Sequence, residues 1–156
     1  MNYKDIDIKR SYISCGEDGI ADALIVPALK CTNHYYRSVG YFSSGVFDTI
    51  MDGIPTFVRN GGDIKMIASP KLNNEDIEAI NLGYEEKERV IGNAFSREFI
   101  EEVENFDDSR LAMLAELIAR GILDIRIAVT NTLGDYHDKL GILEDFEGNK
   151  VAFYGS

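Results

Sequence analysis

Strand patterns occur in three stretches of the chain before residue 131. The clearest is at 123–130, where apolar residues occupy every second position and polar residues most of the others. A second strand is expected at 63–69, directly after the stop signal Asn60-Gly61-Gly62. A short strand is also expected at 38–45, because small residues end it and open a helical pattern. We expect residues 1–17 to form an irregular or edge segment, since they show only a brief alternation.

Apolar residues recur every three or four positions elsewhere in the chain, and this spacing predicts helices. The helical stretches are 18–32, 46–57, 84–105 and 108–120. Within the first, Pro27 predicts a kink or an early end, because proline has no backbone N–H to donate. Asp107 or Asp108 can cap the last helix, and Asn73 or Asn74 can cap a further short one.

The order of these elements predicts the fold class. A strand, a helix, a Gly-Gly turn and a second strand form a βαβ unit, which normally means adjacent parallel strands with a right-handed crossover. We therefore expect an α/β fold, with a mixed β-sheet sandwiched between helical layers. A length of 156 residues fits one domain that spans 1–156. Because the last residues belong to a strand pattern, we also expect the chain to be a fragment of a longer protein.

Composition narrows the class of protein but does not choose a function. Hydrophobic residues make up 45% of the chain and charged residues 28%, as in ordinary folded proteins. No apolar run approaches the length of a membrane span, and the N-terminus has no signal-peptide pattern, so we expect a cytoplasmic protein that binds no membrane. Cys15 and Cys31 fit that compartment as reduced thiols.

The net charge of the chain is strongly negative. Lysine and arginine number 16 against 27 aspartates and glutamates, which gives −11. A polyanion such as DNA is bound through Lys and Arg, so DNA binding would need a locally neutral or positive site, or delivery by another domain. The acidic run between Glu98 and Asp108 has no His or Cys beside it, and we interpret it as a solvated helix face rather than a metal site.

The chemistry of the chain is concentrated in its last stretch. Two apolar arms, 136–144 and 151–156, flank the turn residues Glu147-Gly148-Asn149-Lys150 and predict a β-hairpin. Side chains alternate along a strand, so His137 and Lys139 are expected on the same face. A neutral imidazole can act as nucleophile or general acid/base near pH 7, and an ammonium balances charge on phosphate oxygens. This pair therefore suits attack on a phosphoryl group.

The same stretch resembles the HKD signature of the phospholipase D superfamily, which reads His-x-Lys, four residues, Asp, and a later Gly-Ser. Here the pattern is His137-Asp138-Lys139, four residues, Glu144, and finally Gly155-Ser156. Three departures stand out. Glu144 replaces the usual Asp, ten residues separate it from Gly155, and the Asn that usually follows Gly-Ser is absent.

An earlier block strengthens the resemblance. Gly40-Tyr41-Phe42-Ser43-Ser44, a helix, Gly61-Gly62-Asp63-Ile64-Lys65 and Ile67-Ala68-Ser69-Pro70 look like the opening half of phospholipase-D-like domains fused to bacterial helicase and restriction proteins. The resemblance then covers most of the chain from about residue 20. It implies a phospholipase-D-like fold. It also implies three catalytic residues: His137 as nucleophile, Lys139 on the non-bridging oxygens, and Ser156 as a hydrogen-bond donor to the same phosphate.

This resemblance implies a metal-independent phosphodiesterase, a nuclease that acts on DNA more readily than on RNA through a phosphohistidine intermediate and without a cofactor. Such a module would belong to a restriction or helicase-linked system. Family members with one motif pair two copies across a dimer, so a homodimer is implied. Strand parity places Glu144 on the face opposite His137, which predicts a structural role for Glu144.

Two other functions stay open. A catalytically silent domain that keeps the fold and serves as a binding module would suit the acidic balance and the missing Asn. Lipid phosphodiester hydrolysis is disfavoured, because the sequence shows no apolar surface helix or basic membrane patch.

Overall fold

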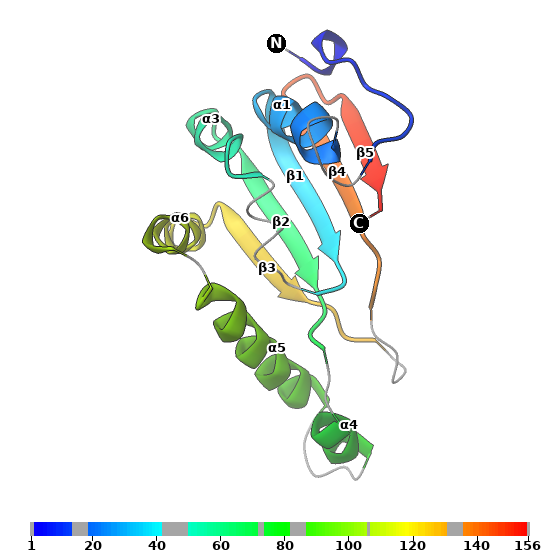
Figure 1. Cartoon of the computed structure of the whole chain (residues 1–156), viewed down its shortest axis with the longest axis vertical. Helices are drawn as coiled ribbons and strands as arrows, with labels where there is room; N and C mark the ends of the chain where they lie inside the picture. Colours follow the sequence, from blue (N-terminus) through cyan, green and yellow to red (C-terminus); the bar gives the residue numbers. More distant parts are fainter. Residues whose placement is uncertain are drawn as a thin grey trace.

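A five-stranded mixed sheet forms the centre of the molecule (Figure 1). The computed structural model describes residues 2–13, 19–41, 50–71, 74–81, 87–105, 107–130 and 136–155. The strands are β1 (Thr32–Val39), β2 (Asp63–Ala68), β3 (Leu123–Ile127), β4 (Leu140–Asp145) and β5 (Lys150–Tyr154). Their order in the sheet is β3-β2-β1-β4-β5. The chain is therefore mixed α/β, as the sequence predicted.

Short and long helices connect these strands. The described helical elements are η1 (Tyr3–Asp5), η2 (Ala21–Ile25), α1 (Val26–Leu29), α3 (Ile54–Arg59), α4 (Asn74–Asn81), α5 (Lys87–Val103) and α6 (Asp108–Ala119). η2 is a π-helical segment that leads directly into α1, where Pro27 lies in the first turn. The predicted early end is confirmed, since a proline there has no N–H for the α-helical bond. The predicted cap is also confirmed: Asp107 accepts a hydrogen bond from the Arg110 amide.

The pairing of the strands divides the sheet into two halves. β1, β2 and β3 run parallel to one another, which confirms the predicted βαβ unit. β4 lies antiparallel to β1 and forms a hairpin with β5. The central strand β1 thus has a parallel neighbour on one side and an antiparallel neighbour on the other.

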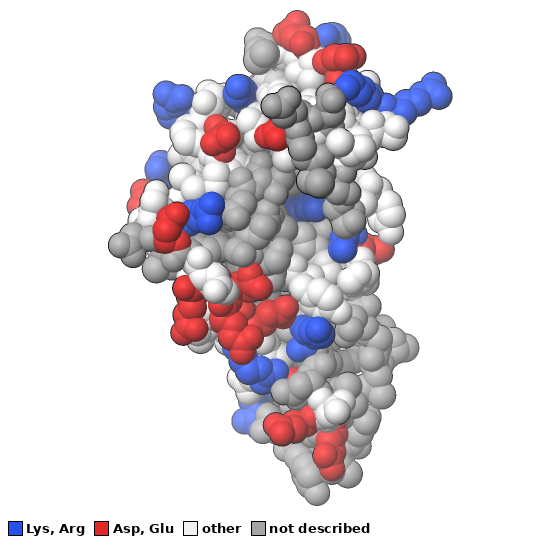
Figure 2. Space-filling view, in the orientation of Figure 1, with Lys and Arg blue, Asp and Glu red and all other residues white. Residues whose placement is uncertain are grey.

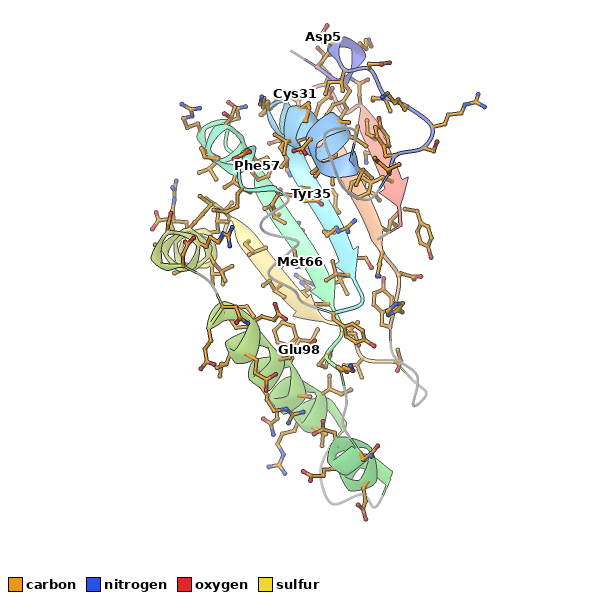
Figure 3. All side chains as sticks on the ribbon, in the orientation of Figure 1. Asp5, Cys31, Tyr35, Phe57, Met66 and Glu98 are labelled. Carbon is orange, nitrogen blue, oxygen red and sulfur yellow. The ribbon has the colours of Figure 1, made fainter. Side chains whose placement is uncertain are left out.

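The described helices that contribute to the core pack on one face of the sheet, so the described residues do not form the expected sandwich between two helical layers. The strand residues in that core alternate in register and share this face; they are Tyr35, Val39, Ile64, Met66, Ala68, Leu123, Leu143 and Phe153. Figure 3 labels two of them, Tyr35 on β1 and Met66 on β2. On the opposite face, Ile67, Leu140 and Tyr154 are 43%, 38% and 76% exposed. The physical reason is the direction of the crossovers. β1, β2 and β3 follow one another in one direction, and right-handed connections then place their helices on the same side.

Three strand boundaries differ from the sequence-based expectation. β1 begins at Thr32 and ends at Val39, so the strand expected at 38–45 lies earlier in the chain. β3 ends at Ile127 instead of 130, and β4 begins at Leu140 instead of 136. The helix expected at 46–57 falls partly on 42–49, outside the described residues, and the observed α3 begins at Ile54. These boundaries depend on partners in the sheet, which a local pattern does not contain.

The closed end of the hairpin is built around a buried carboxylate. Asp145 is only 3% exposed, and its oxygens accept hydrogen bonds from the amides of Glu147 and Asn149 and from the Asn149 side chain, at 2.8–2.9 Å. Burial raises the pKa of Asp145, but the hydrogen bonds from Asn149 and Glu147 outweigh it and hold the pKa below its ordinary value. This turn fixes the register in which β4 and β5 pair. In the described part of the chain, no helix has the length and apolarity to cross a membrane.

Candidate functional site

The segment that carries His137 and Lys139 lies directly before β4, at the carboxyl end of β1. Residues 136–139 have no regular strand assignment, so the expectation that both side chains project from a strand is not met for His137. Lys139 continues the hydrogen-bond ladder between β4 and β5, because its carbonyl accepts a hydrogen bond of 3.0 Å from the Gly155 amide. That bond extends the β4–β5 register by one pair, and it places Lys139 on the same side of the sheet as Gly141 and Leu143.

The imidazole of His137 rests against a glycine. A Cβ atom on Gly40 would lie 2.7 Å from Nδ1 of His137 and 3.2 Å from its Cε1. The ring also meets Tyr41 edge-on, with 5.5 Å between ring centroids. These contacts hold the Nδ1 edge of an otherwise exposed side chain, and Nε2 is not among the ring atoms nearest to Gly40. Sequence reasoning gave Gly40 no role, although a glycine at the end of a strand is a signal for close approach.

A hydroxyl of β1 anchors the backbone on both sides of His137. The Ser38 hydroxyl donates to the Asp138 carbonyl at 2.8 Å and lies 2.8 Å from the Tyr136 hydroxyl. Ser38 is only 8% exposed, so these hydrogen bonds are shielded from water. The segment before β4 is therefore positioned by the end of β1, although it is not itself a strand.

A second cationic side chain, which sequence reasoning missed, lies on the same face as Lys139. Arg37 of β1 pairs with Gly141 of β4, and its guanidinium carbon is 5.0 Å from the ring centroid of Phe153. Its Nε and Nη1 atoms are buried and have no hydrogen-bond partner. The usable signal was a charged residue between Tyr35 and Val39 at strand spacing, but this stretch was not predicted as a strand.

One cluster of acidic side chains lies on α5. Figure 2 shows a red cluster beside this helix, whose described acidic residues near its C-terminal end are Glu98, Glu101, Glu102 and Glu104. Burial raises the pKa of Glu98, which accepts a hydrogen bond from the Lys71 amide at 3.0 Å. Near His137, Asp138 is an exposed carboxylate, whereas Arg37 and Lys139 are cations. The expected neutral or positive charge around His137 and Lys139 stays a prediction.

Glu144 lies apart from this group of residues. It pairs with His34 of β1 and with Lys150 of β5, and its carboxylate is 3.2 Å from the Lys150 ammonium. As the neighbour of Leu143 in a regular strand, it points to the open face of the sheet. The predicted separation from the Lys139 face is confirmed. Ser156, the third expected site residue, lies outside the described residues.

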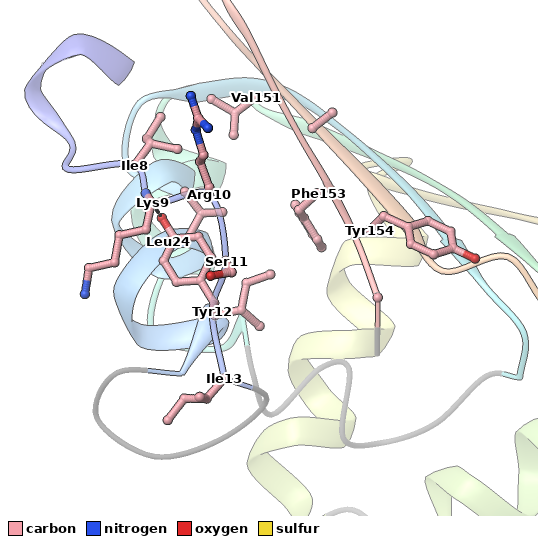
Figure 4. Close-up of a pocket in the computed structure, with 13 residues that line it drawn as sticks. Ile8, Lys9, Arg10, Ser11, Tyr12, Ile13, Leu24, Val151, Phe153 and Tyr154 are labelled. Atoms are coloured by element: carbon pink, nitrogen blue, oxygen red, sulfur yellow. Dashed lines mark hydrogen bonds between the residues drawn. The ribbon is translucent and has the colours of Figure 1, made fainter.

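One hollow in the described part of the chain lies on the far side of Phe153. It has a volume of about 550 Å³ and lies between the N-terminal segment 8–13, Leu24 and β5 (Figure 4). Figure 4 shows Phe153 directed toward this hollow and Tyr154 directed to the other side of β5. The hollow has Lys9 and Arg10 at its rim but no side chain from residues 136–139. We therefore do not include it in the candidate site.

The described residues form no cluster of three or more His, Cys, Asp or Glu side chains that could hold a metal ion. Compared with models of protein families and with curated proteins, the chain matches none. The candidate site is accordingly defined by geometry alone: His137 and Lys139 beside the end of β1, with Gly40 and Arg37 as their neighbours in the sheet.

Proposed function

We propose that this chain is a phospholipase-D-like phosphodiesterase that cleaves DNA through a phosphohistidine intermediate. The observation that carries the proposal is the placement of His137 and Lys139 at the carboxyl end of β1, with the Gly155 amide after β5 hydrogen-bonded to the Lys139 carbonyl. Carboxyl ends of parallel strands are where ligands of α/β sheets commonly bind. The reaction type, phosphodiester cleavage through a phosphohistidine, comes from the resemblance of the His137 to Ser156 spacing to the HKD signature.

In the proposed first step, the Nε2 lone pair of His137 bonds to phosphorus and the bond from phosphorus to the leaving oxygen breaks. The leaving oxygen takes a proton from a general acid, and Lys139 balances the charge that develops on the non-bridging oxygens. In the second step, water attacks phosphorus, its proton returns to the conjugate base of that acid, and the phosphorus–nitrogen bond breaks. Contact with Gly40 on the Nδ1 side favours Nε2 as the attacking atom.

The general acid in this scheme is the partner's His137, because one copy of the chain supplies one such motif. We propose a two-fold dimer in which the two imidazoles face a shared groove. A helicase-linked or restriction-type system is the expected setting, since the net charge of −11 leaves DNA delivery to other domains or subunits. Light scattering that shows a strict monomer with full cleavage activity would remove the dimer from this proposal.

The central test is single-turnover cleavage of labelled DNA, labelled RNA and a chromogenic phosphodiester, each with and without EDTA. We expect His137→Ala to lower the rate at least about 1,000-fold, as removal of other nucleophiles does. His34→Ala is the matched control, because His34 is the second histidine of the chain and is bonded to Asp63 at 2.5 Å on the opposite face. Quenching in alkali, in which the phosphorus–nitrogen bond is stable, should trap phosphohistidine in the wild type and in His34→Ala but not in His137→Ala.

Three outcomes would overturn the proposal or the part of it that excludes a metal. Full cleavage by His137→Ala would exclude the phosphohistidine route. A wild-type protein that binds DNA but cleaves none of the three substrates would favour the alternative, a silent phospholipase-D-like binding module. Cleavage that disappears in EDTA would show that the reaction requires a metal.

A further inference from the structure

The Arg37 guanidinium is a buried charge whose hydrogen bonds are incomplete. Nε and Nη1 are both buried, and neither has a hydrogen-bond partner. Arginine stays protonated in proteins, so it cannot relieve this situation by losing its charge. A buried charged donor without an acceptor is costly, and such groups are rare unless a ligand completes them. An acceptor from outside the chain, such as an anion, would complete these hydrogen bonds.

No carboxylate of the described residues serves as that anion. Asp145 lies on the same face of the sheet, but its oxygens are occupied by Glu147 and Asn149. Glu144 is on the other face and pairs with Lys150. The guanidinium of Arg37 does lie over the ring of Phe153, with its carbon 5.0 Å from the ring centroid. The ring attracts the cation, but it offers no oxygen or nitrogen acceptor to the N–H groups.

The sheet register places a second cation next to Arg37. Arg37 is directly opposite Gly141, and Lys139 lies two residues before Gly141 on the same face. Such diagonal neighbours in an antiparallel pair are about 7–8 Å apart at Cα, within the reach of two long side chains. Lys139 also forms no ion pair with the residues that the structure describes. Two like charges side by side repel each other unless an anion lies between them.

Phe153 of β5 covers Gly141 on this face of the sheet. A Cβ on Gly141 would lie 2.1 Å from Cζ of Phe153, so the ring occupies the space that a side chain on Gly141 would need. The group beside Arg37 on this face is therefore the Phe153 ring instead of a β4 side chain, and an anion shared with Lys139 has to reach the guanidinium past the edge of that ring. The aromatic ring closes the far side of the guanidinium against the hollow beyond it.

We propose that Arg37 and Lys139 together form an anion site that holds a non-bridging oxygen pair of a phosphate group. The inference rests on the proposed function for the identity of the anion, since a phosphate held by Lys139 is the one that His137 would attack. It adds a substrate-contacting residue on a different strand from the HKD-like segment. Arginine suits this role because its planar fork binds two oxygens of a tetrahedral anion at once.

The direct test is an NMR titration of the wild-type protein with inorganic phosphate, observed at the Arg37 Nε–Hε resonance. This resonance is assigned by its loss in Arg37→Lys. We expect a saturable shift that sodium chloride at equal ionic strength does not reproduce, and we expect at least about a tenfold weaker affinity in Lys139→Met. No saturable shift with phosphate, or a shift unchanged by Lys139→Met, would overturn the shared site.

A second arm uses labelled single-stranded DNA in the His137→Ala background, which prevents cleavage. Arg37→Met should weaken binding about tenfold or more and lower the salt slope by about one counterion. Arg126→Met, an exposed arginine on the opposite face beside Asp124, is the matched control and should change neither. Unchanged DNA binding in Arg37→Met would contradict the inference. A phosphate shift at Arg37 in a protein that cleaves nothing would instead refute the proposed function alone.

Thermal unfolding separates this role from a structural one. An unpaired buried charge destabilises a fold, so Arg37→Met should melt at the same temperature as the wild type or higher without phosphate. Phosphate should raise the melting temperature of the wild type more than that of Arg37→Met. A large drop in melting temperature for Arg37→Met in phosphate-free buffer would assign Arg37 to the structure of the sheet instead.

Discussion

The β1–β4–β5 region carries two buried charges on one face of the sheet, and their hydrogen bonding differs. At the hairpin turn, Asp145 has three hydrogen bonds and lies 3% exposed. At the middle of the same face, Arg37 has buried nitrogens without partners and a second cation as its diagonal neighbour. A buried charge with complete hydrogen bonds stabilises a fold, whereas one with incomplete bonds leaves donors that a ligand could complete. We therefore expect the turn to contribute stability, and we place the proposed anion site at Arg37 and Lys139.

The largest expected effect is on catalysis at Lys139, which directly precedes β4 at the end of the hairpin opposite the turn. Lys139→Ala should lower the single-turnover rate by about 100–1,000-fold, or about 2.7–4 kcal/mol, because it removes a preorganised cation from the developing phosphate charge. The unfolding free energy should stay within about 0.5 kcal/mol, since the described residues offer Lys139 no ion pair to lose. If Lys139→Ala lowered the unfolding free energy strongly but cleaved at the wild-type rate, Lys139 would have a structural role instead of a catalytic one.

The next effect is on stability at the closed end. Asp145→Ala should lower the free energy of unfolding by about 2–4 kcal/mol, because the Glu147 and Asn149 donors lose their buried acceptor. Urea unfolding of the wild type and the variant gives this value. The cleavage rate of the fraction that remains folded should be unchanged. Asp145→Asn, which keeps one acceptor oxygen, should be intermediate.

A substitution at Gly40 tests how the imidazole is held. Gly40→Ala would place a methyl group 2.7 Å from Nδ1 of His137, so the ring must move. We expect cleavage to fall about 10–100-fold, about 1.4–2.7 kcal/mol, because small displacements of a reacting group are costly. Gly92→Ala in α5 is the control, since a Cβ there meets nothing within 4 Å and should leave cleavage unchanged. Equal activity in both variants would remove Gly40 from the site.

Acidification should weaken the closed end. The pKa of Asp145 is lower in the folded protein than in the unfolded chain, so the unfolded chain takes up the proton first as the pH falls. The stabilisation is therefore fully present above about pH 4, the ordinary value for Asp, and is lost as the pH falls through the folded pKa. Unfolding curves of the wild type and Asp145→Asn between pH 6 and 2 should converge at low pH. Curves that stay parallel would contradict this assignment.

The smallest effect is expected on the open face. Glu144→Gln breaks a partly exposed ion pair with Lys150 and should change the unfolding free energy by less than about 0.5 kcal/mol. The cleavage rate should stay within about twofold, because Glu144 points away from the face of Lys139 and Arg37. A large catalytic loss would show that the acidic position of the HKD-like pattern acts in the reaction after all.

The sequence by itself determined much of the architecture. The alternation at 63–68, the Gly-Gly stop before it, the Asp107 cap and the turn residues 147–150 are local signals, and each element formed where its signal lay. Local patterns also predicted the final hairpin, and His137 and Lys139 lie directly before its first strand. These features depend on residues a few positions apart, so the sequence contains the information that they need.

Only the tertiary structure decided which side of the sheet the helices cover and which side chains meet. The one-sided packing follows from the order of parallel strands, which no single stretch reveals. The contact between Gly40 and His137, and the diagonal placement of Arg37 and Lys139, join residues about a hundred positions apart through the register of β1 and β4. Register is fixed when strands pair and bury a common face. Sequence analysis therefore did not identify Arg37 as a residue of the proposed site.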